Sequence, residues 1–83
     1  MSNNYDNYMD FDKDFLLKLA FRIKYERAKK GISQEQLAEL SEVSINTIGR
    51  LERGLINISI TNFCRIAKVL DMDLGILSKY DIL

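Results

Sequence analysis

The chain has 83 residues, enough for one small domain, and its twelve basic residues balance its twelve acidic ones, so the net charge gives no sign of a nucleic-acid partner. Nearly half of the residues are apolar and none is proline, which favours a folded, mainly helical chain over a disordered one. With no histidine and only Cys64, the sequence offers no imidazole base, no metal-ligating cluster and no internal disulfide, so we expect neither an enzyme nor a cofactor. The polar first residues and the lack of a long apolar run argue against a secretory signal and a membrane span, and a cytoplasmic protein is expected.

Residues 1–12 are polar and acidic and predict a flexible leader, followed by a domain over residues 13–83. Apolar residues at helical spacing then predict a first helix from about Asp14 to Lys30, which Gly31 ends. Between positions 15 and 30, Glu26 is the single acidic residue. The basic residues of that stretch are Lys18, Arg22, Lys24, Arg27, Lys29 and Lys30. Such a block is either an electrostatic patch for a partner or a solvated helix face, and charge runs are more often the latter.

Two short helices joined by a tight turn follow in the sequence. Ser33, with Gln36 three residues later, has the pattern of a capping box and predicts a helix over about residues 33–41. Ser44 is the next N-cap and predicts a third helix over about residues 44–53. Neither segment is long enough to be a stable helix alone in water, so both must pack on the rest of the domain.

The remainder of the chain predicts a loop and two more helices. The segment LINISI has no partner strand and is interpreted as a loop, after which Ser59 caps a fourth helix. The inward side of that helix is expected to carry Ile60, Phe63, Ile66, Ala67 and Leu70. Cys64 within it is more often a small buried apolar residue than a reactive thiol. A turn at residues 71–73 and a short fifth helix over about residues 74–80 complete an all-α chain.

The two short helices and their turn have the arrangement of a helix-turn-helix. In such a unit the first helix braces across the DNA backbone, and the second lies in the major groove with its N-terminal residues at base edges. The expected third helix has apolar Ile48 and Leu51 on one side and polar residues on the other. Among the outer residues, Asn46 can pair with adenine, Arg50 with guanine, and Ile45 can touch a thymine methyl group.

The stretch RIKYERAKKGISQEQLAELSEVSINTIGRLERG, continued through ISITNFCRIAKVLDMDLGIL, closely resembles the XRE/Cro family of phage and bacterial repressors over roughly residues 16–77. The pattern Arg-x-x-x-Gly-(Ile/Leu)-Ser-Gln-x-x-Leu-Ala, then Val-Ser-x-x-x-Ile-x-x-x-Glu-x-Gly, is much more specific than a general helix-turn-helix. The resemblance implies a five-helix lambda-repressor-like DNA-binding domain that binds operator DNA and commonly dimerises. Small members of the family include phage Cro and repressor domains and controller proteins of restriction–modification systems.

The same resemblance implies which residues contact DNA. They are Gln34, Ser44, Ile45, Asn46, Thr47, Arg50 and Arg53. Three of them, Ile45, Asn46 and Arg50, would face base edges. The other four would contact the sugar–phosphate backbone, and Arg53 would do so together with the amide region of Gly54.

The resemblance also implies that Arg27 pairs with Glu52 and so ties the first helix to the end of the third. The alternative is two unrelated surface charges, but Arg27 continues the inward-facing line of the first helix, which favours a partly buried pair. The chain departs from the family pattern in the turn, where Glu42 occupies a position that is usually glycine. Since a positive φ is costly for glutamate, the turn is expected to be either strained or slightly re-shaped. Asp71 replaces a second common glycine and tolerates that conformation better.

A single recognition helix reads only a few base pairs, so we expect a symmetric homodimer on a palindromic operator with half-sites about one helical turn apart. The apolar residues expected at the dimer interface are Leu55, Ile56, Ile58, Met72, Ile76 and Leu83. Alternatively, the C-terminal residues fold back on their own domain. The competing function is an antitoxin- or antirepressor-like interaction module that binds protein through LINISI or KYDIL, with weak or no DNA binding. No small-molecule effector is evident in either case.

Overall fold

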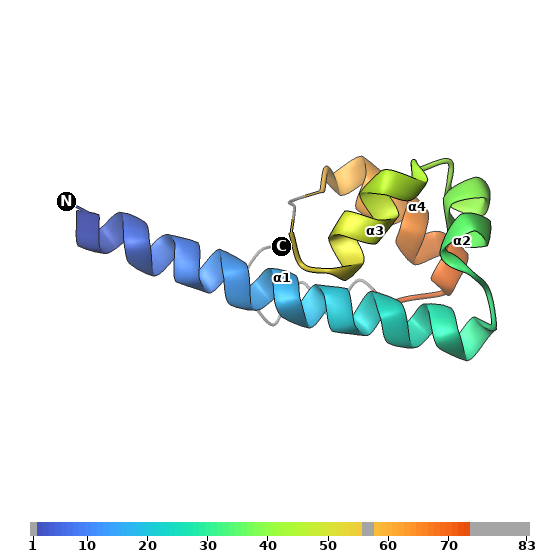
Figure 1. Ribbon diagram of the computed structural model, residues 1–83, viewed down its shortest axis with the longest axis horizontal. Helices are drawn as coiled ribbons and strands as arrows, with labels where there is room; N and C mark the ends of the chain where they lie inside the picture. Colours follow the sequence, from blue (N-terminus) through green and yellow to red (C-terminus); the bar gives the residue numbers. More distant parts are fainter. Residues whose placement is uncertain (1, 56–57, 74–83) are drawn as a thin grey trace.

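The computed structural model describes residues 2–55 and 58–73, with side chains from residue 13 onward. Its helices are α1 (Ser2–Lys30), α2 (Gln34–Ser41), α3 (Ile45–Glu52) and α4 (Ile60–Leu70). α1 runs along one side of the domain, and the three shorter helices gather over its C-terminal half (Figure 1). The described part of the chain is all-α, as predicted, whereas the expected fifth helix over residues 74–80 lies outside it. No helix in these described ranges combines the length and apolar character needed to cross a membrane.

α1 begins earlier than the sequence predicts. The expected start is about Asp14, after a flexible leader over residues 1–12, but the structure is helical from Ser2. The first glycine of the chain is Gly31 and there is no proline, so nothing in this stretch interrupts a helix once it has formed. The leader is therefore corrected to helix from its second residue, while the division of the chain at residue 13 stays a prediction.

The starts of the three short helices follow the capping signals in the sequence. Ser33 Oγ accepts a hydrogen bond from Gln36 N at 3.0 Å, and Gln36 Oε1 accepts one from Ser33 N at 2.8 Å, which completes the predicted capping box. Ser44 and Ser59 cap α3 and α4, each accepting a 3.1 Å hydrogen bond from the backbone amide three residues later. Local chemistry thus fixes where each short helix begins.

Left-handed backbone conformations end or follow the helices. Both departures from the usual glycine adopt a positive φ, which is 59° at Glu42 and 55° at Asp71. Gly54 has a φ of 70°, a conformation that favours glycine, and a Cβ added there would lie 2.9 Å from Leu17 Cδ2. This close approach lets the turn after α3 sit directly on α1.

The core lies between α1 and the three short helices. The largest fully buried side chains are Ile23, Leu37, Ile48, Leu51, Ile66 and Leu70, so all four helices contribute. The inward pattern predicted for α4 fails at its first residue, because Ile60 is 59% exposed at the edge of the apolar face. Cys64, one turn later, is also exposed rather than buried, which corrects the expectation of a small core residue.

Candidate nucleic-acid interface

α3 joins the core with one face and presents a mostly polar face to solvent. Ile48 and Leu51 are fully buried, whereas Asn46 and Arg50 are exposed. Ile45, the first residue of the helix, is 44% exposed at the border between the two faces. The three residues expected to face base edges therefore all reach solvent from the same short helix.

Ser44 and Thr47 are tied to each other at the N-terminus of α3. Ser44 Oγ accepts a hydrogen bond from Thr47 N at 3.1 Å and donates one to Thr47 Oγ1 at 2.8 Å. The Thr47 hydroxyl can still donate its own hydrogen outward, and the free amides of a helix N-terminus attract negative charge. This corner of the molecule has the chemistry that hydrogen-bonds a phosphate oxygen.

Gln34 and Arg53 converge over Gly49, although they belong to different parts of the helix-turn-helix. Gly49 is buried, and a Cβ added to it would lie 3.4 Å from Arg53 Nη1 and 3.8 Å from Gln34 Oε1. Gly49 is not among the functional residues predicted from the sequence. A glycine inside a helix costs about 1 kcal/mol relative to alanine, and that cost is the signal that could have marked a close approach here.

Glu52 is the buried centre of a network that links three helices. Its side chain is 1% exposed and accepts hydrogen bonds from Arg27 Nε at 2.7 Å, Arg27 Nη2 at 2.9 Å and Gln34 Nε2 at 3.0 Å. Arg27 Nη1 also donates to Ile32 O at 3.0 Å, and the hydrogen bonds to Glu52 raise the pKa of the Arg27 guanidinium above its ordinary value. The ion pair expected between Arg27 and Glu52 is present, and the same carboxylate holds Gln34 in place.

The backbone amides that follow α3 are already engaged within the chain. Arg53 N donates to Arg50 O at 3.2 Å, Gly54 N to Leu51 O at 2.9 Å, and Leu55 N to Arg50 O at 3.0 Å. The resemblance implies that the amide region of Gly54 contacts a phosphate, and that contact stays a prediction. The side chain of Arg53 is exposed at this turn, so its guanidinium hydrogens are accessible from solvent.

The basic block of α1 is largely neutralised by pairing within the chain. The ion pairs are Lys18–Asp14, Arg22–Glu26, Arg27–Glu52, Lys29–Glu26 and Lys30–Asp71. Five of the six basic residues between positions 15 and 30 therefore have a carboxylate partner. This favours the interpretation of the block as a helix face rather than as a patch for an acidic partner.

A family model described as helix-turn-helix matches residues 23–77, which is more than half of the chain. The chain belongs to the XRE/Cro family of helix-turn-helix proteins. No curated protein and no solved structure matches it. The matched range contains every residue expected to contact DNA, and membership of the XRE/Cro family indicates a DNA-binding transcription regulator.

The residues expected at the dimer interface of this XRE/Cro protein fall into three groups. Leu55 is 59% exposed and Ile58 is half-buried, so both reach the surface. Met72 is only 9% exposed and belongs to the core. Its backbone amide donates a hydrogen bond to Ala67 O at 2.9 Å, where the chain turns back after α4. Met72 is therefore not an interface residue of the described fold. The others lie outside the described residues and are Ile56, Ile76 and Leu83.

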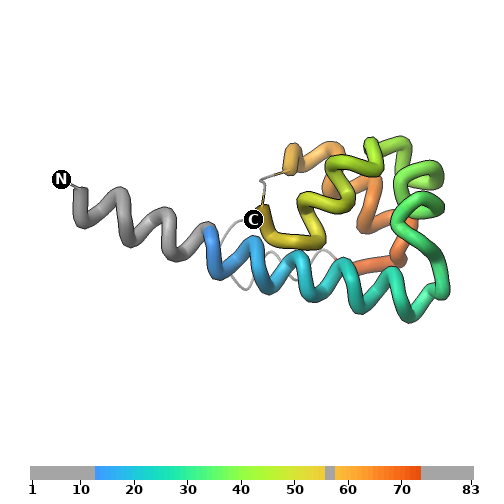
Figure 2. The backbone as a smooth tube through the Cα atoms, in the orientation of Figure 1, coloured from blue at the N-terminus to red at the C-terminus, as the bar shows by residue number. Residues whose placement is uncertain are grey.

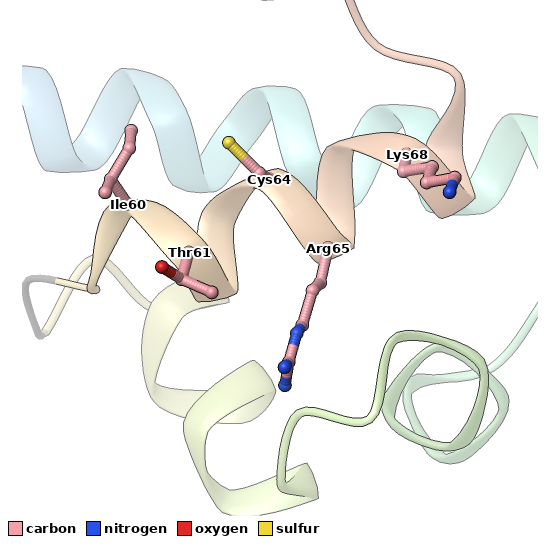
Figure 3. A pocket seen from close by; sticks show the side chains of 5 residues that line it. All are labelled: Ile60, Thr61, Cys64, Arg65 and Lys68. Atoms are coloured by element: carbon pink, nitrogen blue, oxygen red, sulfur yellow. The ribbon is translucent and has the colours of Figure 1, made fainter.

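A groove along α4 is a separate surface feature of the XRE/Cro domain. The side chains that line it are Ile60, Thr61, Cys64, Arg65 and Lys68 (Figure 3). Arg65 extends from α4 toward the side where α2 and α3 lie, and with Glu42 it also lines a neighbouring hollow at the turn of the helix-turn-helix. The turn is thus flanked by charges of both signs.

Proposed function

We propose that this protein is a sequence-specific transcriptional regulator that acts by occupying operator DNA. The observation that carries the proposal is the exposed polar face of α3, held rigidly by the buried Glu52 network behind it. A recognition helix needs both properties, because base contacts specify only when the side chains meet the groove in one fixed orientation.

In the proposed complex α3 lies in the major groove. Arg50 donates two hydrogen bonds to a guanine, Asn46 pairs with an adenine, and Ile45 contacts a thymine methyl group. Gln34 and Arg53 contact phosphates on one side of the groove, and their fixed positions over Gly49 support this role. The Ser44–Thr47 corner contacts the backbone at the start of the helix.

Two copies are proposed to bind a palindromic operator, because one recognition helix reads too few base pairs to select a site from a genome. Regulation then follows from blocking or recruiting polymerase. Occupancy of the operator is proposed to rise with the concentration of the protein itself.

Selection of bound sites from a random duplex pool tests the proposal. We expect an enriched palindrome that binds at least about a thousandfold more tightly than its scrambled version at physiological salt. Because the helix-turn-helix itself carries only Arg50 and Arg53 as cations, the affinity is expected to fall less steeply with salt than for a protein with many phosphate contacts. No enrichment, together with no duplex binding even at low salt, would contradict the proposal.

The second candidate is an interaction module with this fold that binds protein through the LINISI segment. Two exposed apolar residues, Leu55 and Ile60, each 59% exposed at the ends of that segment, favour it. The acidic residues Glu35, Glu39 and Glu42 near the expected DNA face also favour it, because they repel phosphates. Binding of a protein partner that is lost in Leu55→Asp, with no duplex binding by either form, would select this candidate.

A further inference from the structure

The exposed side of α4 begins with an apolar residue and ends with two basic ones. Ile60, Cys64 and Lys68 follow one another at intervals of four residues, and Thr61 and Arg65 line the same groove (Figure 3). Residues so spaced lie along one face of a helix, and all five are exposed. The groove along α4 therefore runs from an apolar end to a cationic end.

The surface continues from this groove onto the end of α2. Arg65 and Lys68 also line the neighbouring hollow, together with Leu40 of α2. Leu40 is 60% exposed and Ile60 is 59% exposed, so each end of the joined surface carries a large uncovered apolar side chain. Because Arg65 and Lys68 line both hollows, the two cations lie between these apolar ends.

The two cations at the centre of this surface have no carboxylate partner. Neither Arg65 nor Lys68 forms an ion pair with any described residue, whereas five of the six basic residues between positions 15 and 30 do. Glu42 also lines the second hollow, but it forms no ion pair with either of them. Neighbouring unpaired cations attract acidic groups, so the charge of this surface is complementary to carboxylates.

We propose that this surface binds a segment of a partner protein in which acidic residues are flanked by apolar ones. The carboxylates of the segment pair with Arg65 and Lys68, and its apolar side chains cover Ile60 at one end and Leu40 at the other. Since an α-helix rises 1.5 Å per residue, the groove from Ile60 to Lys68 is about 12 Å long. That length matches about four residues of an extended chain or about two turns of a helix.

The shape of the groove favours a protein segment over a small molecule or a nucleic acid. Its volume is about 370 Å³, but the described residues that line it all belong to α4, so it is a surface groove that cannot enclose a ligand. A nucleic acid would gain little from the apolar ends at Ile60 and Leu40, and its phosphates would be repelled by Glu42. A segment that is both apolar and acidic uses the whole surface.

This surface is separate from the candidate DNA interface. α3 and α4 lie over the same half of α1 (Figure 2), and each of them packs on α1 and on α2. None of the residues expected to contact DNA lines either hollow. The inference goes beyond the proposed function and does not rest on it, because binding of a peptide is measured without DNA. It also differs from the second candidate function, since Leu55 lies outside the lining residues.

Selection of peptides from a random display library on the full chain tests the proposal. We expect enriched peptides with acidic residues beside apolar ones. A synthetic copy of one should bind the wild type at least about tenfold more tightly than the double variant Arg65→Glu, Lys68→Glu, because the charges would then repel. The matched control is Lys13→Glu, Lys24→Glu, which makes the same change in charge at exposed residues of α1 and should bind the peptide as the wild type does. Circular dichroism verifies that each variant is folded.

Cys64 locates the bound peptide without any substitution. It is the only cysteine of the chain and lies in the groove, so a bound peptide should slow its alkylation by iodoacetamide several-fold, as measured by mass spectrometry. The control peptide carries amides in place of its carboxylates and should give no protection.

Four results would each overturn the proposal. They are a selection without acidic–apolar peptides, equal binding of the peptide to the wild type and the Arg65→Glu, Lys68→Glu variant, an unchanged alkylation rate at Cys64, and a duplex affinity that falls more in this variant than in its control. The last result would assign the two cations to phosphate contacts. Arg50→Ala should lose operator binding and keep the peptide, so failure of the proposed function and failure of this inference give different results.

Discussion

Arg27 and Glu52 lie 25 positions apart in the sequence and meet through two hydrogen bonds of 2.7 and 2.9 Å. The Glu52 side chain is 1% exposed and that of Arg27 is 20% exposed, so the carboxylate depends on this partner for its charge to be tolerated. The pair fixes the end of α3 to α1 on the side away from the exposed face of α3. Fold stability and the orientation of the recognition helix therefore depend on the same contact.

Arg27→Met should lower the free energy of unfolding by about 3–5 kcal/mol, because it leaves Glu52 as a buried charge with only Gln34 as a donor. Arg65→Met is a matched control on the exposed side of α4 and should change stability by less than about 0.5 kcal/mol. Urea denaturation followed by circular dichroism measures both. Equal small losses in the two variants would mean that the pair contributes no more than a surface contact.

Glu26 should make the fold sensitive to acid. The hydrogen bond from Arg22, with a further contribution from Lys29, lowers the pKa of Glu26 below its ordinary value of 4.5. A carboxylate with a depressed folded pKa stabilises the fold above 4.5 and loses that contribution as the pH falls through the folded value. The melting temperature of the wild type should therefore exceed that of Glu26→Gln at pH 7, and the difference should shrink as the pH falls below 4.5. A gap that does not change with pH would contradict this assignment.

The helix boundaries of the helix-turn-helix could be predicted from the sequence because they depend on contacts within a few residues. The hydroxyls of Ser33, Ser44 and Ser59 each cap the helix that follows, as their positions indicate. The resemblance narrows the turn at Glu42 to two alternatives, a strained turn or a re-shaped one, and its φ of 59° is that of the strained turn.

Features that depend on how the helices pack against one another could not be predicted from the sequence. The exposure of Ile60 and Cys64 follows from which face of α4 meets α1 and α2, and the periodicity of a short helix leaves its edge residues ambiguous. The approach of Gln34 and Arg53 over Gly49 requires the angle between α2 and α3, which no local pattern contains. Contact of these residues with DNA stays a prediction.

Glu42→Gly should stabilise the protein by about 0.5–1 kcal/mol. Glu42 has a φ of 59°, a conformation that costs a residue with a Cβ about 1–2 kcal/mol, and glycine removes that cost while losing some entropy on folding. Glu39→Gly, inside α2, should instead destabilise by about 1 kcal/mol. The midpoints of urea unfolding measure both changes, and a loss of stability at position 42 would show that the Glu42 side chain makes a compensating contact.

Arg50→Ala should weaken binding to the selected operator by about 1–3 kcal/mol and relax the preference at one position per half-site. Gln34→Ala should weaken binding to operator and scrambled duplex by similar factors, because a phosphate contact positions the protein without reading sequence. Fluorescence anisotropy titrations with both duplexes separate the two effects. Equal losses on both duplexes for Arg50→Ala would rule it out as a base-reading residue.

Gly49→Ala should raise the stability of the fold without raising its affinity for DNA. Alanine is favoured over glycine inside a helix by about 1 kcal/mol, and the added Cβ would meet only the ends of two long side chains, Arg53 Nη1 at 3.4 Å and Gln34 Oε1 at 3.8 Å. The end of the Arg53 side chain can shift by a few tenths of an ångström, so the folded state should gain about 0.5–1 kcal/mol.

Any shift concerns Arg53 alone, because 3.8 Å to Gln34 Oε1 is an ordinary van der Waals contact, so Gly49→Ala should cost little affinity for operator or scrambled duplex. Gly49→Leu should instead lower the affinity for both duplexes, because a larger side chain would displace Gln34 and Arg53 from the surface of α3 altogether. Unfolding and duplex titrations on the same samples measure the two properties. A Gly49→Leu variant that binds duplex as tightly as the wild type would show that the convergence of Gln34 and Arg53 over Gly49 serves packing alone.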